Sequence, residues 1–220
     1  MKNCIFIYLG VILALVFQTC LTSPVPDSGD SPSAEDKQLN EHNKLYKEVL
    51  KEFTDFTIEM SEDFLEFTTK ITEEIKQNNE LPDIEHPNRR QLEFTKALEH
   101  VKSSEGDHTL LNMYKLTEDV LEATRTLDDP KFLTEEREKL IEKYKIREFM
   151  NKIRERYMKF YESLSKAVDV YADELSETQK QEQHKLLDWN KDFSETKDFR
   201  SKTDKFADFF DFFKPCCEDL

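Results

Sequence analysis

Glycine is scarce in this chain. The sequence of 220 residues contains 3 glycines, Gly10, Gly29 and Gly106. The tight turns of β-rich and α/β domains favour glycine, so this scarcity argues against both classes. The abundant Glu, Lys and Leu residues favour helix instead. The composition therefore predicts an all-α protein.

The signatures of common enzyme sites are also missing. The sequence has no Gly-rich phosphate loop, HExxH, CxxC or GxSxG motif. No two of its 5 histidines share a helix face at i, i+4 spacing, which argues against a zinc site. A di-iron bundle would need Glu-x-x-His on two of its helices, and the sequence does not supply two. We therefore expect a protein that is not an enzyme and that holds no metal or cofactor.

The longest apolar run is too short to cross a bilayer. Residues 5–17 give about 13 apolar positions, whereas a span needs roughly 20. A weakly basic start, this run and the small and polar residues that follow form a secretory signal peptide. Cys20 and Thr22 suit the −3 and −1 positions of a cut after residue 22, and Leu21 with Ser23 is the other option. We expect a secreted, extracellular protein with no membrane span; an uncleaved N-terminal anchor is the alternative.

Removal of residues 1–22 would leave two cysteines, Cys216 and Cys217, within the final segment 215–220. Thiols oxidise in the extracellular space, so this pair is the candidate disulfide. The two cysteines either bond to each other, pair with another chain, as in a disulfide-linked homodimer, or stay free. Because both lie at one end of the chain, they cannot cross-link the fold, which must depend on its core.

The charge excludes one group of partners. Charged residues make up 36% of the chain and the formal net charge is −15, which argues against nucleic acid and anionic lipid surfaces as partners. Such high charge also occurs in disordered chains. The 17 phenylalanines and 7 tyrosines recur periodically and argue against disorder, except in the Pro/Ser-rich residues 23–34, which we interpret as a flexible lead-in.

Apolar residues that recur every three or four positions indicate four amphipathic helical arms. The arms cover residues 35–79, 88–127, 134–175 and 176–214, with a break near Gly106 and a capping box at Ser176 and Gln179. Arms of about 38–45 residues with short links predict one domain, residues 35–214, built as an elongated antiparallel (up-down-up-down) four-helix bundle. Two long helical hairpins packed side by side are the alternative, and short links disfavour a parallel coiled coil.

Phenylalanines crowd the end of the fourth arm. On a helical wheel, the candidate apolar stripe occupies an arc of roughly 100°; it consists of Phe199, Phe206, Phe209, Phe210 and Phe213. Phe212 lies outside this arc, and Asp204, Asp208 and Asp211 lie opposite it. We interpret the stripe as the buried face of the last helix. An exposed aromatic patch that binds lipid or a partner is the alternative.

Charge is unevenly distributed along the arms. Residues 131–166 contain 11 Lys and Arg against 7 Glu, whereas residues 35–79 contain 12 Asp and Glu against 6 Lys. Electrostatic matching between arms, with i, i+4 pairs such as Glu135–Lys139, explains this pattern most simply. The alternative is an anion-binding basic strip, formed by Arg147, Lys152, Arg154, Arg156 and Lys159.

Two functions fit these observations. The first is a secreted, non-enzymatic helical protein that acts by binding another extracellular protein. The second is an extracellular carrier of lipid or another apolar ligand, in a helical bundle like that of the exchangeable apolipoproteins. The comparison with apolipoproteins is one of fold alone. The narrow apolar stripes and acidic polar faces favour the first, because lipid-binding helices place Lys and Arg beside a wide apolar face.

Overall fold

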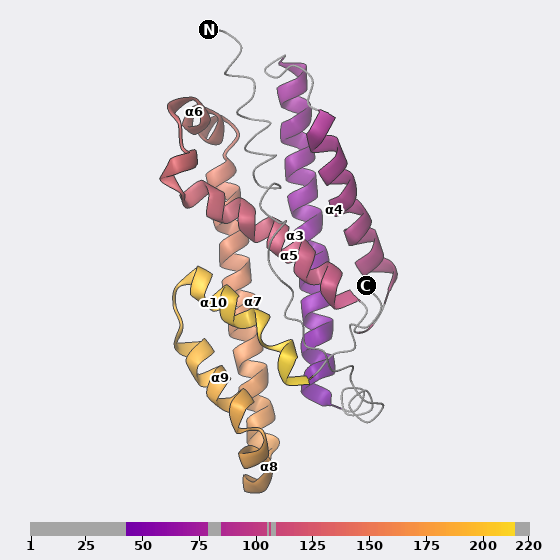
Figure 1. The fold of residues 1–220 in the computed structure, drawn as a ribbon, viewed down its shortest axis with the longest axis vertical. Coiled ribbons are helices and arrows are strands. Elements are labelled where there is room, and N and C mark those ends of the chain that lie inside the picture. The colour runs from indigo at the N-terminus through magenta and orange to yellow at the C-terminus, as the bar shows by residue number, and fades with distance from the viewer. Residues whose placement is uncertain (1–42, 79–84, 105, 107–108, 214–220) are drawn as a thin grey trace. The chain divides into compact units, whose positions relative to one another are not determined.

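A computed structural model describes residues 43–78, 85–104, 106 and 109–213 (Figure 1). Every regular element in these ranges is a helix, so the all-α prediction is confirmed. The described chain divides into two compact units. Unit 1 comprises Thr54–Ile153, and unit 2 comprises residues 43–53 and 154–213.

The division between the units does not fall at a proline. It passes within α3 (Lys44–Gln77) and within α7 (Ile146–Glu174), both of which are continuous helices. Sequence patterns that depend on helix-breaking residues therefore give no sign of it. The single domain of residues 35–214 stays a prediction.

In unit 1, α4 (Glu85–Ser103) packs antiparallel to α3. The rings of Phe64 and Phe94 lie 5.6 Å apart, and further along α4 Lys102 forms an ion pair with Glu62. As the residue numbers rise along α4, those of its partners fall along α3. This order of contacts establishes the antiparallel orientation.

The predicted break in the second arm is confirmed at Gly106. The chain leaves α4 at Ser103 and enters α5 (Leu110–Asp128) after a turn in which Gly106 has φ +80°. This left-handed conformation is the one that glycine adopts most readily. The hydroxyl of Thr109 donates to the carbonyl oxygen of Gly106 at 2.8 Å and closes the turn.

The third arm is not one helix, contrary to the prediction. After the short turn η2 (Pro130–Phe132), α6 (Glu135–Lys143) ends before Tyr144, and α7 begins at Ile146. Lys145 between them has φ +54°, which interrupts the helix. The break lets Tyr144 pack against Ile71 and Ile75 of α3 in a buried cluster.

The fourth arm is divided as well. It consists of α8 (Glu177–Glu182), α9 (His184–Glu195), α10 (Phe199–Ala207) and the 3₁₀ turn η3 (Phe210–Phe213). The predicted capping box is present: Ser176 and Gln179 exchange side-chain to backbone hydrogen bonds at the start of α8. Asp198 caps α10 by accepting from the backbone N–H of Ser201 at 2.8 Å. These polar caps satisfy backbone N–H groups where the two helices begin.

Candidate functional site

Aromatic rings fill the core of unit 2. Phe206 lies at their centre, with its ring centroid 5.0–5.4 Å from those of Phe53, Phe160 and Tyr161. Three elements thus meet around this one side chain: α3, α7 and α10. The buried rings of unit 2 are Tyr46, Phe53, Tyr157, Phe160, Tyr161, Phe193, Phe206, Phe209, Phe210 and Phe213.

The structure divides the predicted apolar stripe into buried and half-buried members. Four of its phenylalanines, Phe206, Phe209, Phe210 and Phe213, are buried, and Phe199 at the start of α10 is half-buried. The stripe does not lie on a single helix, because α10 ends at Ala207 and η3 continues it. In the 3₁₀ turn, residues three apart lie above one another.

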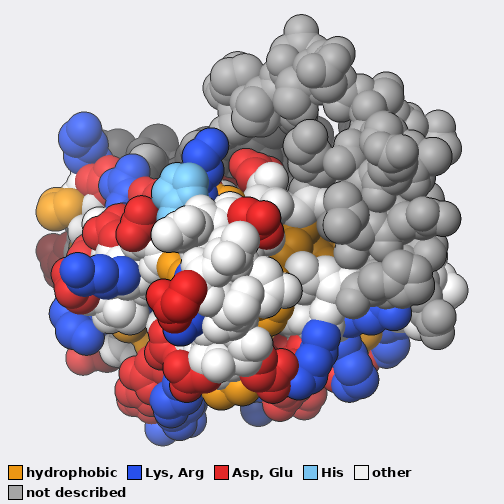
Figure 2. Space-filling model, turned by 90° about the horizontal axis from the view of Figure 1, so that it is seen from below, with side chains coloured by type: hydrophobic (Ala, Val, Ile, Leu, Met, Phe, Trp, Pro, Cys, Tyr) orange, Lys and Arg blue, Asp and Glu red, His pale blue; other side chains and the backbone are white. Residues whose placement is uncertain are grey.

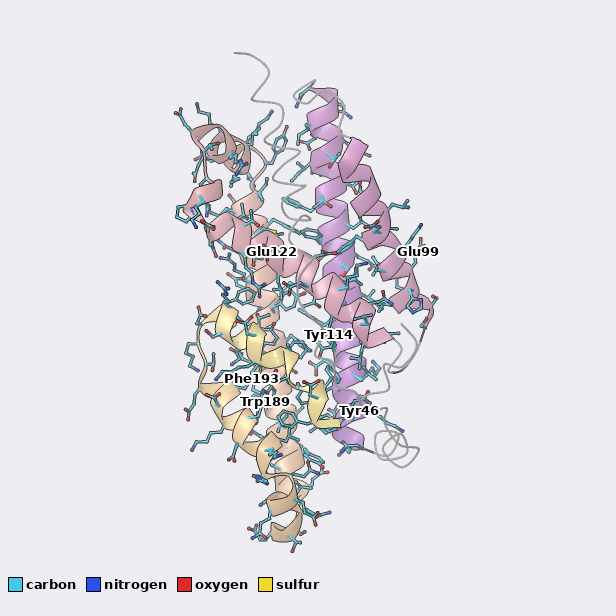
Figure 3. The ribbon with its side chains drawn as sticks, viewed as in Figure 1. Tyr46, Glu99, Tyr114, Glu122, Trp189 and Phe193 are labelled. Atoms are coloured by element: carbon cyan, nitrogen blue, oxygen red, sulfur yellow. The ribbon has the colours of Figure 1, made fainter. Side chains whose placement is uncertain are left out.

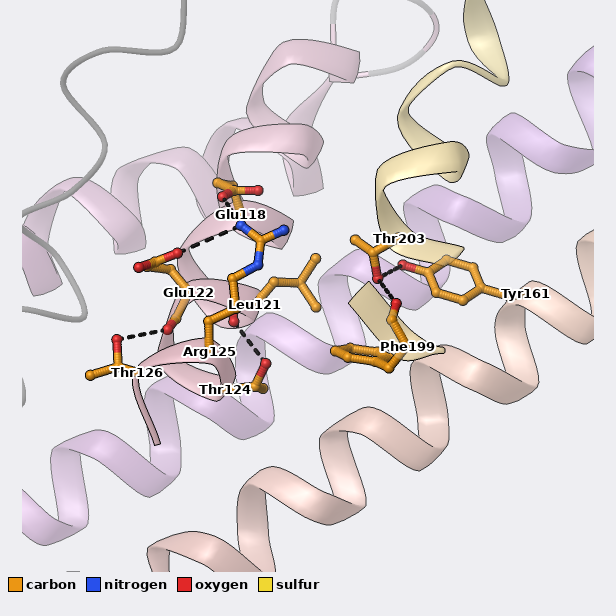
Figure 4. A network of polar contacts seen from close by, with 9 residues as sticks. All are labelled: Glu118, Leu121, Glu122, Thr124, Arg125, Thr126, Tyr161, Phe199 and Thr203. Carbon is orange, nitrogen blue, oxygen red and sulfur yellow. Dashed lines mark hydrogen bonds and ion pairs between the residues drawn. The ribbon is translucent and has the colours of Figure 1, made fainter. Parts of the chain in front are cut away.

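A chain of two hydrogen bonds joins α7 to α10 (Figure 4). The phenol of Tyr161 donates to the hydroxyl of Thr203 at 3.0 Å, and that hydroxyl donates to the carbonyl oxygen of Phe199 at 2.9 Å. Every polar atom in this chain has a partner, so it can be buried without the large cost of an unpaired group. It fixes the position of α10, and hence of the phenylalanines that follow.

Asn190 joins α9 to α7. Its side chain is buried, with 4% of the residue exposed. The Oδ1 atom accepts from the hydroxyl of Ser165 at 2.9 Å, and Nδ2 donates to the carbonyl oxygen of Ser165 at 3.2 Å and to the carboxylate of Asp169 at 2.8 Å. The apolar pattern of α9 gave no sign of this buried amide, and a lone Asn among charged residues is not a recognisable signal.

Trp189 connects α9 with α10 and η3 (Figure 3). Its ring stacks on that of Phe193 at 4.6 Å, and it also contacts Phe209 at 5.4 Å and Phe212 at 5.9 Å. The indole Nε1 donates to the carbonyl oxygen of Lys205 at 3.1 Å. The ring is half-buried, so one part of it belongs to the core and another reaches the surface.

Lys202 is an unusual member of this core, with only 3% of the residue exposed. Its ammonium lies 4.7 Å from the ring centroid of Phe193 and donates to the carbonyl oxygen of Thr196 at 3.3 Å. Burial lowers the pKa of Lys202, and the nearby charge of Lys197 lowers it further, while Glu162 opposes the shift. The sequence did not single out this lysine.

Three exposed residues, Asp208, Asp211 and Phe212, follow α10. Phe212 is 36% exposed, and both aspartates are exposed. The backbone N–H of Asp211 donates to the carbonyl oxygen of Asp208, the residue that caps the end of α10, at 3.3 Å. Burial raises the pKa of Asp211, and the neighbouring charge of Asp208 raises it further. Among the described residues, no cation pairs with either carboxylate.

The candidate basic strip does not form one face. All five residues lie on α7. At about 100° per residue, Arg147 and Arg154 share one side, whereas Lys152, Arg156 and Lys159 lie roughly 120–180° away from them. Arg147 forms an ion pair with Glu138 at 3.6 Å. The guanidinium of Arg154 lies 5.9 Å from the ring centroid of Phe199.

Ion pairs within single helices are common on the surface. The predicted pair of Glu135 and Lys139 is confirmed at 2.8 Å. On α5, Arg125 lies 2.8 Å from Glu118 and 3.6 Å from Glu122 (Figure 4). Acidic and basic side chains are interspersed on the face that Figure 2 shows. These pairs are placed to support their own helices.

The remaining predicted site, Cys216 and Cys217, lies outside the described residues. Within the described ranges, no group of three or more His, Cys, Asp and Glu side chains is placed to hold a metal ion. None of the helices described is both long enough and apolar enough to span a membrane. Comparisons with models of known families, with curated proteins and with solved structures gave no match.

Proposed function

We propose that this chain is a secreted, non-enzymatic helical protein that acts by binding another extracellular protein. The observation that carries the proposal is the packing around Phe206. Its ring is surrounded by the chain's own rings at 5.0–5.4 Å, so this core is filled by side chains. A filled core leaves the surface as the place where the protein acts.

The alternative is an extracellular carrier of lipid or another apolar ligand. The observation in its favour is the size of the aromatic core of unit 2, which would suit an apolar ligand if the short helices α9 and α10 moved apart. Two side-chain connections oppose that movement. Asn190 ties α9 to α7, and the hydrogen bond between Tyr161 and Thr203 ties α10 to α7. A carrier would have to break both, so we favour interaction.

The rest of the proposal comes from the sequence. Residues 1–22 would direct secretion and be removed. Cys216 and Cys217 would then join two chains, bond to each other or bond to a partner, since the extracellular space favours oxidised thiols. The four arms would pack as an elongated antiparallel four-helix bundle, in which the second, third and fourth arms each contain more than one helix. Small-angle scattering of the purified protein tests this shape.

Native mass spectrometry of the protein from culture medium, purified without reductant or lipid-stripping steps, tests the function. The expected result is a polypeptide that starts at Ser23, is free of small molecules and is monomeric or disulfide-paired. An extra mass of a few hundred daltons that disappears on denaturation would make the carrier function the better account. Retention of residues 1–22 would contradict the processed, secreted form.

A further inference from the structure

We draw no further inference here: the strongest candidate, the partly exposed pair of rings formed by Trp189 of α9 and Phe212 of η3 at the surface of unit 2, carries no proposal because nothing in the structure shows what covers it.

Discussion

The indole Nε1 of Trp189 donates a hydrogen bond to the carbonyl oxygen of Lys205 at 3.1 Å, and so links α9 to α10. The carbonyl oxygen also accepts the backbone N–H of Asp208 at 3.2 Å. It therefore keeps one partner when the indole is removed. The indole hydrogen bond thus adds to stability, but it is not the only hydrogen bond that the carbonyl oxygen of Lys205 accepts.

Replacing Trp189 by Phe should lower the free energy of unfolding by about 1–2 kcal/mol, from the lost hydrogen bond and the smaller ring. Urea unfolding followed by circular dichroism measures this, because the variant has no tryptophan. A free energy equal to that of the wild type would show that the link contributes nothing.

Asn190→Ala should lower the free energy of unfolding by more than the small number of deleted atoms suggests. The substitution leaves the buried hydroxyl of Ser165 without the acceptor that it has at 2.9 Å. We expect a loss of about 2–3 kcal/mol, because an unsatisfied buried polar group adds to the lost hydrogen bonds. Asn151→Ala, at an exposed position of α7, should change stability by less than about 0.5 kcal/mol. Equal effects of the two changes would contradict the network.

Phe206 and Phe212 allow the core and the surface to be compared with the same substitution. Phe206→Ala should cost about 3–5 kcal/mol, because it opens a cavity where three elements meet. Phe212→Ala should cost less than about 1 kcal/mol, because that side chain is 36% exposed. The denaturant midpoints of the two variants measure this difference in stability. Similar midpoints would contradict a core that is filled around Phe206.

Lys202 should make stability rise with pH in the alkaline range. Its pKa is lowered in the folded protein, chiefly by burial, from the ordinary value of 10.5. Below the folded pKa, the folded state carries the cost of the buried charge. Between the folded pKa and 10.5, only the unfolded state retains the proton, so the free energy of unfolding increases as the pH rises.

Lys202→Met removes this contribution, and comparison with the wild type cancels the titration of other groups. The difference between the two free energies of unfolding should therefore shift in favour of the wild type as the pH rises from about 7 to 10. Urea unfolding at several pH values measures the shift. A difference that is constant over this range would mean that Lys202 does not titrate in the folded protein with a lowered pKa.

Lys145 occupies a backbone conformation that glycine adopts with less strain. Its φ of +54° separates α6 from α7. Lys145→Gly should raise the free energy of unfolding by about 1 kcal/mol, because it relieves the left-handed conformation. Lys145→Ala should give no such gain, since alanine has the same Cβ. Thermal unfolding of both variants checks the pair, and destabilisation by glycine would argue against the break.

The sequence predicted the helical class because its apolar residues recur with a clear period. It also predicted the break at Gly106 and the cap at Ser176, both of which depend on residues with specific backbone roles. It missed the break at Lys145, where no glycine or proline marks it. Apolar residues continue across the break at Tyr144, Ile146 and Phe149, so their pattern gives no sign of it.

The division of the fourth arm into short helices was missed, because no glycine or proline marks its breaks. Its apolar pattern steps by six between Phe193 and Phe199, and Asp198 stands three residues before Ser201 as a helix cap does. The buried polar residues of the site had no signal at all. Asn190 and Lys202 are typical surface residues in a helix, and only their tertiary surroundings bury them. The helical wheel used only the helical period, and on that basis it placed Phe212 outside the stripe. In the structure, Phe212 is 36% exposed.

Unit 2 has a core filled by its own rings, and we propose that the protein therefore binds other proteins at its surface and does not carry apolar ligands. Isothermal titration calorimetry of the full chain with oleate, kept below micellar concentrations, tests this most directly. We predict no saturable heat and no change in Trp189 fluorescence. Saturable binding of oleate accompanied by a shift of the Trp189 emission would contradict the claim, because it would show that the core opens to an apolar ligand.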